Sequence, residues 1–325
     1  MRIVSLLPSA TEILFALGLD AEVIGVSHEC DFPPQAAKRQ VLIHSRIPHG
    51  LTALEMDTLV RQFMARGESL YSVDGDILRE LAPDLVVTQD LCHVCSASPE
   101  DLAAVIRDFK KPPKVLCLNP QKLSDVWRDI MLVAQATSRV AAAEMVLHEI
   151  HARLNTLQRQ IEQVTARPRV VFLEWLEPLY VGGHWVPEMV ALAGGEDLFG
   201  RLGAASFRVQ VKDVVAASPD VIVVSPCGYN AKQARKEYGA MSWPLEWQSI
   251  PAVRNGRVFA FEANSYASRP GPRLATGVEA LAKIFQPGID VPDDAARGFV
   301  LMDGGRENYP ANETADVLSR RAHVL

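Results

Sequence analysis

The 325-residue chain lacks the motifs that define several large classes of enzymes. It contains no GxxxxGK phosphate loop, no GxGxxG after a strand-like run and no GxSxG elbow. Nucleotide binding and serine-hydrolase chemistry of the usual kinds depend on those motifs and are not expected here. The chain also has no basic patch, and its net charge is −6. We therefore expect no nucleic acid partner.

Long hydrophobic runs are missing as well. No stretch reaches the roughly 18 uninterrupted apolar residues of a membrane helix, so we expect a protein that is not embedded in a membrane. Met1 and Arg2 lead directly into the strand-like run 3–7, which leaves no room for the three regions of an export signal. This pattern predicts a cytoplasmic protein.

Cysteine is scarce, with five residues in the whole chain. An odd, small number in a chain of this size does not form a disulfide framework. In a reducing compartment these thiols stay available as ligands or nucleophiles.

A Pro-Asp motif occurs twice, before the apolar runs Leu85–Thr88 and Val221–Ser225. Each run is too short for a helix and is typical of a strand buried on both faces of a parallel sheet. The repetition predicts an α/β fold with two similar lobes, and 325 residues exceed the size at which one core stops growing. Ligands bind beyond the carboxyl ends of such strands, so Cys92 and Cys227 are expected to face a shared crevice.

The sequence signals for helices are less regular than those for the strands. Ser9 and Glu12 have the spacing of a capping box. The run 123–164 contains no glycine or proline and predicts one helix of roughly 60 Å that crosses between domains. We therefore divide the chain into an N-terminal α/β lobe (1–121), a connecting helix (122–166), a C-terminal α/β lobe (167–287) and a loosely packed tail (288–325).

Together these segments carry a resemblance to a known family. The opening Pro8-Ser9-Ala10-Thr11-Glu12, the run Val23–Ser27 with Asp31-Phe32-Pro33, both Pro-Asp strands and the long helix resemble the helical-backbone metal receptors over residues 1–287. These are the class III substrate-binding proteins of ABC transporters, and the chain is most similar to the cobalamin-binding branch. The resemblance implies two Rossmann-like lobes joined by one long rigid helix. It also implies binding and delivery of a flat metal chelate, such as cobalamin or another corrinoid, rather than catalysis.

One departure from that family concerns its transporter. In the cobalamin and siderophore receptors an acidic residue on each lobe pairs with arginines of the permease, and the matching positions here hold Asp76 and Lys212. A lysine reverses the charge on one lobe and argues against an ABC permease partner, although the neighbouring Asp213 could substitute.

A second departure is the set of cysteines that follow strand ends. These are Cys30, Cys92, Cys95 and Cys227. A CxxC pair with two further thiols would complete a tetrahedral zinc site or ligate an iron-sulfur cluster. A redox dithiol, or thiols with a structural or substrate-contacting role, are the alternatives. Cys117 differs, because it lies inside the apolar run 115–118 and is expected to be a small buried hydrophobe.

The second lobe contributes an aromatic segment, 174–188. Trp175, Tyr180 and Trp185 are predicted to stack on a planar macrocycle, and His184 is a candidate axial donor to its metal. The alternative is that the tryptophans cap the core and His184 binds a backbone carbonyl. Further candidates for ligand contact follow later strands: Tyr229, Tyr266 and Arg269, the last of which could pair with the rim of the ligand.

Two functions remain in contention. The first, which we favour, is a binding protein for a corrinoid-type chelate. The second is a cytoplasmic metalloenzyme in which the cysteines hold an iron-sulfur cluster or zinc and Glu174, Glu177 or His184 handle protons. Fold alone does not choose between them, because function belongs to the site.

Overall fold

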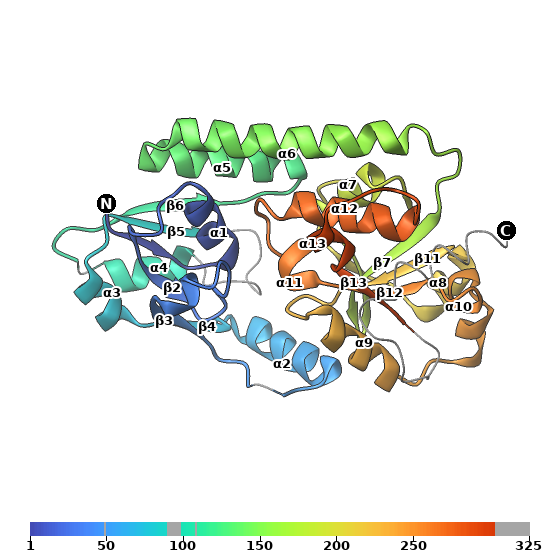
Figure 1. Ribbon diagram of the computed structural model, residues 1–325. Helices are drawn as coiled ribbons and strands as arrows, with labels where there is room; N and C mark the ends of the chain where they lie inside the picture. The colour runs from blue at the N-terminus through green and yellow to red at the C-terminus, as the bar shows by residue number, and fades with distance from the viewer. Residues whose placement is uncertain (49, 90–98, 108, 303–325) are drawn as a thin grey trace. The chain divides into compact units, whose positions relative to one another are not determined.

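The computed structural model describes residues 1–302 except 49, 90–98 and 108 (Figure 1). The chain divides into two compact units. Unit 1 comprises Met1–Glu149 and the short segment Pro270–Pro272, and unit 2 comprises Ile150–Arg269 and the chain from Arg273 onward. Each unit is built on its own sheet, which confirms the predicted two-lobe α/β fold.

Unit 1 has a six-stranded sheet in the order β4-β3-β2-β1-β5-β6. The strands are β1 (Ile3–Ser5), β2 (Val23–Ser27), β3 (Gln40–Ser45), β4 (Tyr71–Val73), β5 (Leu85–Gln89) and β6 (Lys114–Leu118). All neighbours pair in parallel except β3 and β4. The central strands are buried on both faces, which is why their sequences are continuously apolar.

Helices cover both faces of this sheet. The crossovers from β1 to β2 and from β5 to β6 lead in opposite directions, so α1 (Pro8–Ala16) and α4 (Pro99–Ile106) lie on opposite faces. On the α4 side, Val4, Leu42 and Val86 pack with Leu78 of α3 (Gly75–Leu81). Helix α2 (Ala53–Arg66) joins β3 to β4, and α5 (Leu123–Thr137) follows β6.

Unit 2 has a parallel centre, β7 (Arg169–Leu176), β11 (Val221–Val224) and β12 (Val258–Phe261). The antiparallel strands β8 (Leu179–Val181) and β13 (Phe299–Leu301) flank it, and β10 (Phe207–Arg208) and β9 (Glu196–Asp197) pair with β8 and β7. Its helices are α7 (Val186–Leu192), α8 (Val211–Ala217), α9 (Ala231–Ala240), α10 (Pro251–Arg254), α11 (Ala263–Tyr266), α12 (Leu274–Phe285) and α13 (Asp293–Ala296).

The two Pro-Asp motifs make the same hydrogen bonds. In unit 1 the carboxylate of Asp84 accepts from the backbone amide of Arg2 at 2.9 Å, and in unit 2 Asp220 accepts from the amide of Arg169 at 2.9 Å. In both, the preceding helix ends on a residue in the left-handed region, Ala82 or Ser218. Each aspartate thereby fixes the start of a neighbouring parallel strand, so the duplication predicted from sequence is present in the backbone.

The predicted single helix over 123–164 is wrong in length. The chain forms α5 and then α6 (Val140–Ile161), because Ser138 adopts a left-handed conformation with φ 59° and ends α5. The division between the two units falls inside α6, so this helix contributes residues to both. Its 22 residues correspond to about 33 Å rather than 60 Å.

Buried polar contacts fix the second half of α6 within unit 2. The guanidinium of Arg153 donates to both carboxylate oxygens of Glu279 on α12, at 2.5 and 3.1 Å, and to the hydroxyl of Thr276 at 2.8 Å. The side chain of Glu279 is only 5% exposed. One turn further on, Gln158 donates to the carbonyl of Leu192 at 2.6 Å, which joins α6 to the end of α7.

Three smaller expectations also fail. Ser9 forms no capping box, because α1 begins at Pro8 with Leu7 as its cap, which places Ser9 inside the first turn. Cys117 is exposed rather than buried, because β6 is the edge strand of its sheet. The segment after residue 287 is more than loose cover, since β13 pairs with β12 and Met302 is buried. Within the described part of the chain, no helix combines the length and apolar character needed to span a membrane.

Replacing Arg153 with Met is expected to lower the free energy of unfolding of unit 2 by about 3 kcal/mol, because Glu279 would remain buried without its partner. Four of the five tryptophans lie in unit 2, so urea denaturation followed by tryptophan fluorescence reports mainly on this unit. The double variant Arg153→Met/Glu279→Met should recover much of the loss. Equal stability of the single variant and the unmodified protein would contradict this role.

Asp129 on α5 gives stability a dependence on pH. Its side chain is buried, one carboxylate oxygen has no hydrogen bond, and desolvation raises its pKa to about 7 despite the nearby positive charge of Arg128. Because the unfolded chain ionises this group near its ordinary value of 3.8, the folded state loses stability as the pH rises from about 4 to 7. Asp129→Asn should flatten this part of the profile, measured as urea midpoints by circular dichroism between pH 4 and 8. Parallel profiles for the two proteins would refute the assignment.

Candidate functional site

In each unit the carboxyl ends of the parallel strands form one edge, where open α/β sheets bind ligands. In unit 1 this edge is lined by small hydroxyl side chains at the ends of apolar strands. Ser5 ends β1 and Ser27 ends β2, and both are buried. On β5, Thr88 and Gln89 are also buried. The sequence signal for this edge is therefore a polar residue that closes each apolar run.

Cys30 belongs to a hydrogen-bonded chain at this edge. Its Sγ lies 3.1 Å from Oγ1 of Thr11 and 3.5 Å from Oγ of Ser27, and Thr11 donates to Ser5 at 2.8 Å. The cysteine is 3% exposed. These contacts hold the buried thiol between the first turn of α1 and the end of β2.

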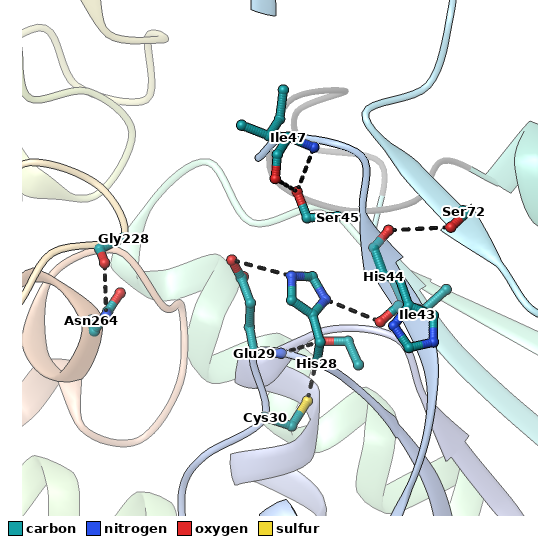
Figure 2. A network of polar contacts seen from close by, with 11 residues as sticks. His28, Glu29, Cys30, Ile43, His44, Ser45, Ile47, Ser72, Gly228 and Asn264 are labelled. Atoms are coloured by element: carbon teal, nitrogen blue, oxygen red, sulfur yellow. Dashed lines mark hydrogen bonds and ion pairs between the residues drawn. The ribbon is translucent and has the colours of Figure 1, made fainter. Parts of the chain in front are cut away.

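His28 ties the ends of β2 and β3 together (Figure 2). Its Nδ1 lies 3.0 Å from the carbonyl of Ile43, and its Nε2 is 3.9 Å from the carboxylate of Glu29. The ring of Tyr71, the first residue of β4, lies 6.2 Å away in a tilted arrangement. This side of the edge therefore presents an imidazole, a carboxylate and a phenol.

In unit 2 the edge is shaped by an irregularity in β7. The register with β8 shifts between Leu173 and Trp175, which makes Glu174 the extra residue of a bulge. Its carboxylate accepts from the amide of Gly183 at 3.2 Å, and its carbonyl accepts from the amide of Cys227 at 3.1 Å. Glu174 thus joins three segments, and one oxygen of the carboxylate that was predicted to handle protons accepts a backbone hydrogen bond.

The aromatic residues of this edge come together around Trp175. Its indole packs edge-on against the ring of Tyr229 at 5.8 Å and donates to the carbonyl of Glu177 at 3.2 Å. Tyr180 is the cross-strand partner of Trp175, so the two side chains share one face of the sheet. All three rings are half-buried. The structure therefore brings together three of the predicted ligand residues.

The short helix α11, which follows β12, completes the same edge. Asn264 donates from its side chain to the carbonyl of Gly228 at 3.0 Å (Figure 2) and from its backbone amide to the carbonyl of Tyr229 at 3.3 Å. Cys227, immediately before Gly228, is exposed. The sequence gave no signal that Asn264 would fix the turn that carries Cys227 and Tyr229.

His184 and Trp185 are arranged differently. Trp185 is buried, and its indole donates to the carbonyl of Ala267 at 2.8 Å, so it packs between α7 and the end of α11. His184 stacks on it at 5.7 Å and has a backbone φ of 52°. Burial lowers the pKa of His184, which keeps the imidazole neutral at neutral pH, the form that binds metals.

The remaining candidates lie close to α12. Tyr266 ends α11, its ring lies 6.0 Å from the guanidinium of Arg273, and its hydroxyl reaches the carbonyl of Asp294 at 3.5 Å. Burial raises the pKa of Tyr266. Arg269 is buried immediately before the segment Pro270–Pro272 that belongs to unit 1.

The predicted cysteine site of Cys30, Cys92, Cys95 and Cys227 remains a prediction. Cys92 and Cys95 lie outside the described residues, and Cys30 and Cys227 belong to different units. Among the residues that the structure describes, no group of three or more histidine, cysteine, aspartate or glutamate side chains is arranged to hold a metal ion. An iron-sulfur cluster or zinc therefore gains no support.

Known proteins resemble this chain over most of its length. The model of the periplasmic binding protein family matches residues 3–264. An ABC transporter substrate-binding lipoprotein of Bacillus subtilis is 28% identical over 299 residues, covering 88% of this chain and 80% of the relative. A vitamin B12-binding protein of Vibrio cholerae is 24% identical over 282 residues, covering 86% of each chain.

Solved structures agree on the fold. The periplasmic vitamin B12-binding protein BtuF of Vibrio cholerae superposes with a TM-score of 0.63 at 23% identity, covering 88% of this chain and 96% of that one. The periplasmic heme-binding protein RhuT of Roseiflexus has a TM-score of 0.63 at 25% identity, covering 90% of this chain and 98% of that one. These matches confirm the expected class III fold.

Close backbone packing beside Glu174 can be tested at Gly183. A Cβ at this position would lie 2.2 Å from the backbone nitrogen of Ser206, so Gly183→Ala must force two backbone segments apart. We expect a loss of at least about 2 kcal/mol in the stability of unit 2, measured by urea denaturation. Gly239→Ala in α9 is the matched control, because its Cβ meets nothing within 4 Å and alanine favours the helix. A Gly183 variant as stable as the control would show that the close approach is not required.

Proposed function

Because the chain belongs to the periplasmic binding protein family, we propose that it captures a flat metal chelate for an ABC transporter, with a cobalamin-type corrinoid as the first candidate ligand and haem as the second. The relatives named for vitamin B12 and the fold neighbour named for heme support this class of ligand. They do not distinguish between its members.

The observation that carries the proposal is the aromatic edge of unit 2. Trp175, Tyr180 and Tyr229 present half-buried rings at the end of a parallel sheet, where a planar π system can be stacked and partly desolvated. The backbone around them is fixed by Glu174 and Asn264, so little ordering is required on binding.

Polar groups around these rings suit the other parts of a metal chelate. The exposed thiol of Cys227 and the neutral imidazole of His184 are the candidate donors to a metal centre in unit 2. Arg269 and Tyr266 remain the predicted contacts for a carboxylate or amide rim. Trp185 contributes by packing, because its indole is buried and already hydrogen-bonded.

An ABC permease is the expected partner. The charge of Lys212 argued against docking, and its side chain is exposed. Asp76 is 95% exposed on the corresponding helix of unit 1, whereas Asp213 accepts from the amide of Gln210 at 2.8 Å as a helix cap. Family membership and the relative named as an ABC transporter substrate-binding lipoprotein outweigh that single charge.

The metalloenzyme alternative and the cytoplasmic location are the two remaining expectations from the sequence. The metalloenzyme gains no support from the described residues or from the relatives. The cytoplasmic location remains a prediction, which fractionation of cells expressing the gene from its native start would check.

Trp175→Leu is expected to weaken binding of cyanocobalamin or haemin by about tenfold or more, because one face of the ligand would lose its aromatic partner. The measurement is a ligand titration by absorbance and by equilibrium dialysis. Trp127→Leu is the matched control, since this half-buried tryptophan lies on α5 of unit 1, outside both edges. Binding by neither ligand to the unmodified protein would overturn the proposed function, and equal affinity of the two variants would overturn the role of Trp175.

A further inference from the structure

Helix α2 has an apolar stripe that lies outside the core cluster formed around Val4, Leu42 and Leu78. Met56, Leu59, Val60 and Phe63 recur at the spacing of one helix face, and all four are half-buried rather than buried. Ala53 is the one residue of α2 that is buried. Among the described residues, none of α2 packs with the cluster formed by Val4, Leu42 and Leu78.

The helix is instead fixed by its ends. Thr52 and Glu55 form a complete capping box, and Gly67 ends the helix in the left-handed conformation with φ 65°. A 14-residue helix is marginally stable alone, so its apolar face is expected to be covered when the protein functions.

The position of α2 in the topology indicates what covers it. Ser45, the last residue of β3, pairs with Tyr71, the first residue of β4. The chain therefore leaves the sheet before α2 and returns after it at the same place, the carboxyl edge that carries Ser27, His28 and Cys30.

Arg46 secures the base of this excursion. Its amide donates to the carbonyl of Leu70 at 2.8 Å, and its guanidinium donates to the carbonyl of Ser69 at 3.0 Å. The same guanidinium lies 5.2 Å above the ring of Phe63. Arg46 thus links the base of the excursion to the helix. We define the arm as α2 with its two caps, residues 52–67.

From this geometry we propose that the arm covers the bound chelate and that its stripe packs on the flat apolar face of the ligand. This inference rests on the proposed function and concerns ligand contact at the carboxyl edge of unit 1. The charged groups of α2 balance, with Glu55 and Asp57 against Arg61 and Arg66, and Asp57 pairs with Arg61 at 2.7 Å. Helices that bind anionic membrane surfaces carry an excess of Lys and Arg on their polar face, which α2 does not have. Its apolar stripe is therefore better suited to contact with a macrocycle.

The test replaces two stripe residues by nearly isosteric polar ones, Met56→Gln/Leu59→Gln, which keeps good helix formers in place. The matched control is Gln62→Met on the exposed face. We expect the double variant to bind cyanocobalamin or haemin about tenfold more weakly, chiefly through faster dissociation, and the control to bind like the unmodified protein. Hydrogen exchange of residues 53–66 should slow when ligand is added to the unmodified protein.

A second variant guards against a folding defect. Replacing residues 47–69 by a short glycine–serine linker keeps the paired ends Ser45 and Tyr71, and it should retain the circular dichroism of the sheet while losing affinity to the same degree. If the unmodified protein binds ligand and these variants bind equally well, the arm has no role in ligand contact. Dependence of dimerisation, or of flotation with anionic vesicles, on Met56 and Leu59 without an effect on ligand affinity would also overturn the proposal. Failure of the unmodified protein to bind either ligand is the separate result that removes the proposed function itself.

Discussion

The constraint on which each unit depends is the burial of parallel strands on both faces. Such strands have no solvent-facing side along their length, so polar side chains can appear only where the strands end. In unit 1 the carboxyl ends supply Ser5, Ser27 and Gln89, and in unit 2 the end of β7 supplies Glu174. In a binding protein of this fold, the polar side chains gather at the carboxyl edge of each sheet, because the buried parts of the strands are apolar.

The two edges have become different in character although the sheets share a motif. The amides of Arg2 and Arg169 bind equivalent aspartates, yet unit 1 carries hydroxyls, a buried thiol and an imidazole, whereas unit 2 carries aromatic rings and an exposed thiol. The difference comes from the connections that follow the strands. The bulge at Glu174 and the turn fixed by Asn264 hold rings in unit 2, and the arm that follows β3 adds an apolar helix in unit 1.

Sequence predicted the elements whose signals are local and continuous. The two strands predicted after the Pro-Asp motifs are found as β5 and β11 to within one residue, because an uninterrupted apolar run carries enough information by itself. The break between α5 and α6 escaped prediction, since Ser138 adopts a conformation that glycine usually marks. Exposure of Cys117 depends on the order of strands in the sheet, which a short apolar segment does not reveal.

The candidate site was predictable to a similar extent. Trp175 and Tyr180 were predicted as ligand contacts, and the structure pairs them across one short hairpin. Their association with Tyr229 and Asn264 joins residues more than 45 positions apart and needs the sheet register. Local pattern also could not separate Trp185 from Trp175, since burial of one and partial exposure of the other are decided by α7 and α11.

The contact between Arg153 and Glu279 spans 126 residues of chain. During synthesis, the strands of the first sheet, all within residues 3–118, leave the ribosome long before the carboxylate that Arg153 requires. The first sheet can therefore fold before the second half of α6 has α12 to pack against. Translation order and the placement of this ion pair therefore mean that the second half of α6 can be fixed within unit 2 only after α12 has been made.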